Sequence, residues 1–164
     1  MNLSGKSLGY ALDKYLACEP DAVSLNCKVA KRSYSKDEIR CLINGACERL
    51  ERFEPQSRII ISLQNSPNFI AWFWACQLLG LVAVPIEPIL SANRLRHQLD
   101  RVAEIAEVID AAAIISPRRA ELEGLTQEIG IQILDEHIEP LDVPIIPRPI
   151  FGNELSIIQF TSGS

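Results

Sequence analysis

Residues 58–88, RIIISLQNSPNFIAWFWACQLLGLVAVPIEP, decide the fold class of this chain. They begin with the β-branched run 58–63, which is typical of a buried strand. Ser66 can cap a following helix, the proline after it suits the first helical position, and Gly80 can end that helix. Val82–Pro85 is a second apolar run of strand length. Because strand, helix and strand in this order form a parallel unit, the stretch predicts an α/β fold.

The alternation of strands and helices continues on both sides of this stretch. Ser35 and Glu38 have capping-box spacing at the start of a strongly periodic helix. We expect one domain with a mainly parallel sheet flanked by helices, which binds ligands beyond the carboxyl ends of its strands. The expected helices cover 8–17, 36–53 and 117–128 and one that Ser91 caps. The expected strands cover 22–30, 112–115, 131–134 and 155–160, with a polar turn at 31–33.

The segment 139–149 holds four prolines and is predicted to be an extended connector. The stretch 69–86 carries no charge, so it needs a membrane test. Gly80 and Pro85 interrupt it, and a spanning helix needs about 20 apolar residues. We therefore favour a buried helix followed by a buried strand over membrane contact, and expect no stable membrane span.

The composition narrows the class of protein. The chain of 164 residues is 48% hydrophobic and 23% charged, with a formal net charge of -5. This balance argues against disorder and against a nucleic-acid or anionic-membrane surface. Arg94, Arg96 and Arg101 are interleaved with acidic residues, which favours a solvated helix face.

Cysteine usage predicts a reducing, cytoplasmic location with free thiols. The five cysteines have no CxxC spacing, and the N-terminus lacks the long apolar core of a signal peptide. Cys76 lies in an apolar run and is expected in the core. His97 and His137 are distant from the cysteines in sequence, so we predict no metal site and surface positions for both. We assign no catalytic residue.

The last four residues, Thr161, Ser162, Gly163 and Ser164, follow the final expected strand. Their hydroxyl groups can donate hydrogen bonds, and the glycine lets the backbone turn tightly around an anion. These features suit a phosphate-binding loop, although an ordinary polar tail would have the same composition.

Several ordered pieces together resemble the adenylate-forming superfamily, which includes acyl-CoA synthetases and fatty acyl-AMP ligases. They are YSKDEI at 34–39, the stretch at 58–88, RVAEIAEVIDAAAII at 101–115 and LSIIQFTSGS at 155–164. The resemblance covers residues 8–164, implies the flavodoxin-like N-terminal subdomain of that superfamily, and looks closest to the fatty acyl-AMP ligases.

The resemblance implies a two-step reaction with ATP and Mg²⁺. A carboxylic acid, by resemblance a fatty acid, attacks ATP to give acyl-AMP and pyrophosphate. The acyl group then passes to the thiol of coenzyme A or of an acyl carrier protein. Because the first step brings two anions together, it needs charge neutralisation. The resemblance assigns Thr161, Ser162, Gly163 and Ser164 to the β- and γ-phosphates of ATP.

The chain departs from the family pattern because the loop stops before its lysine. The adenine-binding aromatic motif, the ribose-binding aspartate and the catalytic lysine of the family are also absent from these 164 residues. We therefore expect residues 1–164 to be the N-terminal portion of an adenylating enzyme, truncated at the phosphate loop, inactive alone and self-associating through its cut surface. A stand-alone nucleotide- or partner-binding module and a decoy protein that pairs with another chain are the alternatives.

Overall fold

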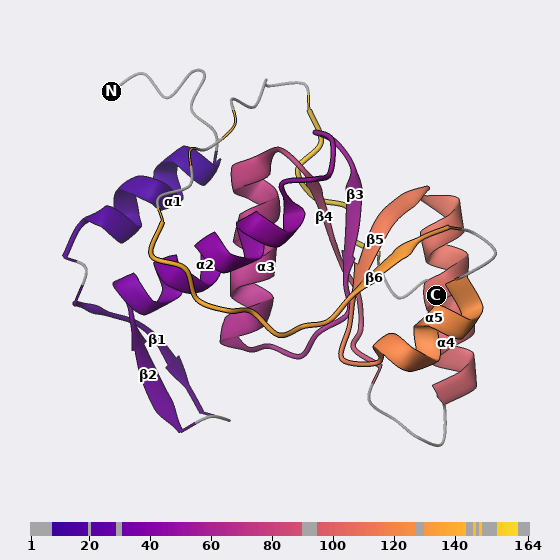
Figure 1. Cartoon of the computed structure of the whole chain (residues 1–164). Helices are drawn as coiled ribbons and strands as arrows, with labels where there is room; N and C mark the ends of the chain where they lie inside the picture. Colours follow the sequence, from indigo (N-terminus) through magenta and orange to yellow (C-terminus); the bar gives the residue numbers. More distant parts are fainter. Residues whose placement is uncertain are drawn as a thin grey trace.

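The computed structural model describes residues 8–19, 21–28, 31–89, 95–126, 130–143, 146, 148 and 154–160. The helices and strands are shown in Figure 1. The helices are α1 (Leu8–Ala17), α2 (Lys36–Leu50), α3 (Pro67–Leu79), α4 (Leu95–Val108) and α5 (Arg119–Thr126). The strands are β1 (Val23–Cys27), β2 (Arg32–Ser35), β3 (Arg58–Ile61), β4 (Val82–Pro85), β5 (Ala111–Ile115) and β6 (Gln132–Leu134).

Four strands form one parallel sheet in the order β4-β3-β5-β6. The stretch that decided the fold class supplies β3, α3 and β4, so the predicted parallel unit is confirmed at one side of this sheet. In β3, Ile60 lies opposite Val84 of β4 and Ile114 of β5. A second, small sheet pairs β1 with β2 in antiparallel fashion.

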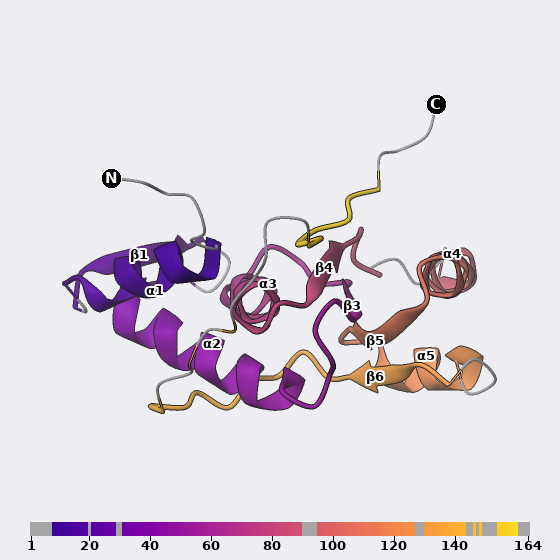
Figure 2. The same cartoon turned by 90° about the horizontal axis from the view of Figure 1, so that it is seen from above.

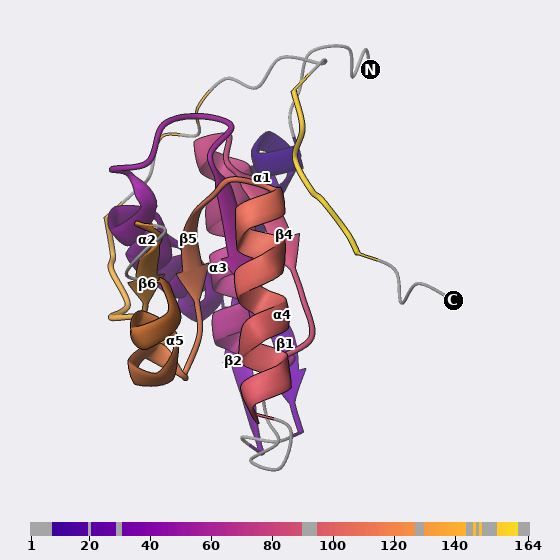
Figure 3. The same cartoon turned by 90° about the vertical axis from the view of Figure 1, so that its right-hand side faces the viewer.

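Helices cover both faces of the parallel sheet. The layer of α2 and α3 lies on one face and the layer of α4 and α5 on the other (Figures 1 and 3). Along β3, Ile59 and Ile61 pack toward the first layer, whereas Ile60 packs toward the second. All three side chains are 0% exposed. This double burial explains why β3 is a continuous β-branched run rather than an alternating one.

Local capping signals set the helix ends as predicted. The Ser35 hydroxyl accepts a bond from the Glu38 N–H at 3.1 Å, and the Glu38 carboxylate accepts one from the Ser35 N–H at 2.8 Å. Ser66 caps α3 by accepting from the Phe69 N–H at 3.1 Å. Gly80 ends α3 in the left-handed region, with φ 68°.

Two local predictions were wrong. The polar run 31–33 is mostly strand, because β2 pairs with β1 and the Ser33 hydroxyl donates to Asn26 Oδ1 at 2.5 Å across the pair. The expected strand 155–160 is reduced to a single parallel bridge between Ile157 and Ala83. Ser91, the expected cap of α4, lies outside the described residues.

After β6, residues 135–143 run along α2 and α3, and residues 154–160 lie at the other edge of the sheet (Figure 2). The bonds that hold this path are spread along both helices. The indole N–H of Trp72 donates to the Glu136 carbonyl at 3.1 Å, and the Leu141 N–H donates to the Cys41 carbonyl at 2.9 Å. The return path brings residues 154–160 beside β4.

The charge-free stretch is a buried helix and strand, as favoured. Trp72 is 0% exposed, and Trp74 is partly buried against the same core. Within the described part of the chain, no helix is long and apolar enough to cross a membrane.

Candidate functional site

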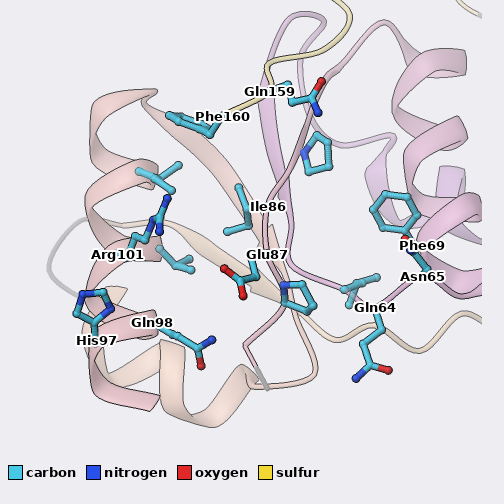
Figure 4. A pocket seen from close by; sticks show the side chains of 15 residues that line it. Gln64, Asn65, Phe69, Ile86, Glu87, His97, Gln98, Arg101, Gln159 and Phe160 are labelled. Carbon is cyan, nitrogen blue, oxygen red and sulfur yellow. The ribbon is translucent and has the colours of Figure 1, made fainter. Parts of the chain in front are cut away.

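A cavity of about 650 Å³ lies at the carboxyl ends of β3 and β4. Its wall combines the loops after these two strands, one side of α4, and Gln159 and Phe160 (Figure 4). Parallel α/β sheets bind ligands at this end of their strands. The volume is in the range of small-molecule sites. The position and size of the cavity therefore make it the candidate functional site.

Backbone bonds at the strand ends fix the two loops that form the floor. The Ile86 N–H donates to the Ile61 carbonyl at 3.1 Å, which continues the pairing of β3 and β4 by one residue. The Ser62 hydroxyl, in a residue that is 0% exposed, donates to the Glu87 carbonyl at 3.3 Å. Glu87 is consequently held at the edge of the cavity by a buried neighbour.

Charged and apolar side chains share this cavity. Glu87 projects from the loop after β4 toward α4, which carries His97, Gln98 and Arg101 on the facing side (Figure 4). Apolar surface comes from Phe69, Ile86 and Phe160. A cationic guanidinium beside apolar surface can bind an anionic group that carries an apolar or aromatic body.

The predicted phosphate-binding residues Thr161, Ser162, Gly163 and Ser164 lie outside the described residues. The structure does place Phe160, the residue immediately before them, in the wall of the cavity. The last described residue before the predicted loop therefore lies at the candidate site.

Sequence reasoning did not single out the residues that form the cavity. Arg101 was assigned to a solvated helix face; it is exposed but also lines the site. Arg96 does match that assignment, because it pairs with Asp100 at 3.1 Å on the exposed surface. For Asn65 the sequence favoured a turn over a ligand contact, and the structure places it in the cavity wall. Its place in the loop between β3 and α3 was the signal that could have found Asn65.

The two buried thiols, Cys47 and Cys76, lie in the core, where Cys76 was predicted. Cys76 is 0% exposed, and burial raises the pKa of its thiol. Burial likewise raises the pKa of Cys47 to about 12. Both histidines, His97 and His137, are exposed. Among the residues that the structure describes, no three His, Cys, Asp or Glu side chains gather as metal ligands do.

A profile of the AMP-binding enzyme family matches residues 12–164. The chain belongs to the AMP-binding enzyme family. This membership confirms the resemblance drawn from the sequence and agrees with the parallel sheet and its flanking helices.

Individual members of the family are distant from this chain in sequence. Malpinin synthetase of Mortierella alpina is 24% identical over 149 residues, which are 88% of this chain and 2% of that protein. Among solved structures, a fatty acyl-adenylate ligase from a study of the E. coli and L. pneumophila enzymes is 21% identical, with a TM-score of 0.76. The match covers 100% of this chain and 31% of that ligase.

The ATP-bound MatB of Rhodopseudomonas palustris has the same fold at 13% identity, with a TM-score of 0.79. That match covers 97% of this chain and 33% of MatB. The chain thus spans about a third of the length of these two solved enzymes. At such identities, the solved structures establish its fold.

Proposed function

We propose that this AMP-binding chain supplies the N-terminal part of an acyl-adenylate-forming ligase. In the reaction, a carboxylate oxygen attacks the α-phosphorus of ATP, the bond to the β-phosphate breaks, and acyl-AMP and pyrophosphate result. The acyl group then moves to a thiol. The observation that carries the proposal is the cavity at the carboxyl ends of β3 and β4, in a chain whose family match runs through it.

Within this proposal, Thr161, Ser162, Gly163 and Ser164 contact the β- and γ-phosphates of Mg-ATP. Phe160 brings the chain to the cavity immediately before them. The apolar wall formed by Phe69, Ile86 and Phe160 favours a substrate with an apolar body, which a fatty acid provides. Coenzyme A or an acyl carrier protein is the thiol acceptor that the family resemblance implies.

We further propose that residues 1–164 alone do not catalyse adenylation. The charge on the reacting phosphates must be neutralised in the transition state, and the lysine-bearing motifs that the family uses for this are absent from the sequence. ATP–pyrophosphate exchange should stay at background for this chain. Turnover above background by the purified chain would overturn this part of the proposal.

Isothermal titration with Mg-ATP tests the function itself. The two samples are the 164-residue chain and the longest product of the same reading frame. Mg-ATP binding by a longer product alone would support a site that needs residues beyond these 164. Micromolar binding by the short chain would favour the alternative, a stand-alone nucleotide-binding module. One observation gives this alternative weight: helices cover both faces of the sheet within this chain alone.

Arg101 offers a sharper test of the cavity as an anion site. Arg101→Gln removes the guanidinium charge from the cavity wall, and loss of one charge-assisted contact should weaken Mg-ATP binding about tenfold. Arg96→Gln is the matched control, since Arg96 lies on the same helix but pairs with Asp100. The titration uses whichever product binds Mg-ATP. Equal effects of both substitutions would exclude a specific role for Arg101.

A further inference from the structure

Two glutamine side chains hold the backbone that leads into the candidate site. Gln77 of α3 is 1% exposed, and its Nε2 donates to the Ser156 carbonyl at 2.8 Å. Only two side chains of α3 carry amides, and the other, Asn68, donates to the Glu136 carbonyl at 3.2 Å. A buried amide costs free energy unless it is bonded. The two polar side chains of this otherwise apolar helix therefore bond the returning chain.

The Gln56 side chain forms two hydrogen bonds with the backbone of Leu155, the residue before Ser156. Its Nε2 donates to the Leu155 carbonyl at 2.9 Å, and its Oε1 accepts from the Leu155 N–H at 3.0 Å. This is the two-bond pattern that a neighbouring strand would offer. Gln56 itself has φ 67°, and its backbone N–H donates to the Gly80 carbonyl at 2.8 Å. Its position is thus tied to the end of α3.

The strand pairing that these amides accompany is short. The Ala83 N–H donates to the Ser156 carbonyl, and the Ile158 N–H donates to the Ala83 carbonyl, each at 3.0 Å. Together they form the single bridge between Ala83 and Ile157. A slip of one residue would turn Ile158 away from the core on the side of α4, against which it packs. One bridge specifies this register weakly, so added bonds to Leu155 and Ser156 matter.

We propose that Gln56 and Gln77 are positioning residues for the phosphate-binding loop. Their amides fix the backbone of Leu155 and Ser156 beside β4, and this register sets the position of Phe160, the residue that precedes the predicted loop. Neither glutamine lines the cavity or touches a reacting group. We call the side-chain bonds from Gln56 and Gln77 to Leu155 and Ser156 the clamp. The clamp rests on these observed bonds, whereas its role for the loop rests on the proposed function.

Hydrogen exchange on the 164-residue chain tests the clamp directly. Gln77→Leu replaces the amide by an apolar side chain of similar size. Gln56→Gly removes the amide and permits the left-handed φ. Each should speed exchange of the Ile158 N–H about tenfold, because the remaining bridge opens more readily. Gln132→Leu, at an exposed position in β6 on the opposite edge, is the matched control and should leave Ile158 unchanged.

Unchanged exchange at Ile158 in both glutamine variants would overturn the clamp. If Gln77→Leu fails to fold, the half-buried Gln56 position still decides the question. A fall in protection across β3 and β5 as well would show general destabilisation and also count against a local clamp.

The role for the loop has a separate readout in the longest product of the reading frame. Both variants should raise KM for Mg-ATP about tenfold while leaving KM for the carboxylic acid unchanged, a split that general loss of structure would not produce. Faster hydrogen exchange at Ile158 with no selective rise in KM for Mg-ATP would overturn the positioning role but support the clamp. If the longest product without substitutions shows no ATP–pyrophosphate exchange, the proposed function is contradicted instead.

Discussion

At the scale of single residues, Gly45 shows how closely the returning chain approaches α2. A Cβ atom added to Gly45 would lie 2.0 Å from the carbonyl oxygen of Glu139 and 2.9 Å from Cγ2 of Ile138. The backbone carbonyl of Glu139 cannot move away as easily as the end of a flexible side chain could. The glycine is therefore required by tertiary packing and not by its own helix.

Gly45→Ala is expected to lower the free energy of unfolding by about 1–3 kcal/mol, the cost of overpacking. In an uncrowded helix the same change would stabilise by about 1 kcal/mol. Urea denaturation followed by circular dichroism measures the difference. Glu48→Ala, at an exposed position of the same helix, is the control and should stay within about 0.5 kcal/mol of the parent. Stabilisation by Gly45→Ala would show that residues 138–139 do not pack on α2.

The buried thiols of Cys47 and Cys76 are expected to make the folded chain less stable at alkaline pH. Their raised pKa values keep both protonated in the folded chain, whereas an unfolded thiol loses its proton near its ordinary pKa of about 8.5. Above that pH the unfolded state binds fewer protons, so the free energy of unfolding falls as pH rises.

Urea denaturation at pH 8 and pH 10 measures this fall. The double variant Cys47→Ala/Cys76→Ala should lose less stability over the interval than the parent, because it lacks both titrating groups. Other alkaline groups contribute equally to both proteins, so only the difference matters. Identical pH dependence in parent and double variant would contradict the prediction.

At the scale of elements, α2 depends on its first turn. The bonds between Ser35 and Glu38 satisfy two backbone N–H groups that the helix cannot pair itself. Glu38 also forms an ion pair with Arg32 of β2, so the cap joins the small sheet to the helix.

Ser35→Ala should cost about 1 kcal/mol of unfolding free energy, the usual value for an N-cap. Ser35→Asp keeps an acceptor at the cap and is expected to retain most of the stability. Thermal denaturation of the two variants compares them directly. Equal losses from alanine and aspartate would show that the acceptor at this position does not stabilise α2.

At the scale of the whole molecule, the edge segment beyond β4 exposes apolar side chains. Leu155, Ile157 and Phe160 are 58%, 44% and 39% exposed, although each is large and hydrophobic. Such surface at a sheet edge favours association with another chain. Self-association of residues 1–164 therefore stays a prediction with a defined surface.

Sedimentation velocity over a wide concentration range should show an average mass that rises with concentration. Ile157→Lys places a charge in the centre of this surface and should shift the sample toward monomer. Val108→Lys is the control, because Val108 is 81% exposed at the end of α4 and does not belong to this surface. A monomer at every concentration, or equal effects of both lysines, would contradict the prediction.

The sequence by itself determined most of the local structure and the family of this chain. Three of these features act over only a few residues, so the local sequence is enough to predict them: the β-branched run of β3, the Ser66 cap and the Gly80 stop. The uncharged stretch 69–86 also predicted a buried helix, which holds Cys76 and Trp72 in the core. The strand 155–160 was overpredicted because an apolar run does not reveal how few partners it will meet.

Only the tertiary structure decided what converges at the candidate site. Glu87 follows β4, Arg101 lies on α4 and Phe160 follows the bridge beside β4. They line one cavity because α4 and residues 154–160 pack against the same strand. The requirement for Gly45 and the roles of Gln56 and Gln77 depend on the path of the returning chain. Packing and hydrogen bonds between distant segments set that path, and no local pattern records them.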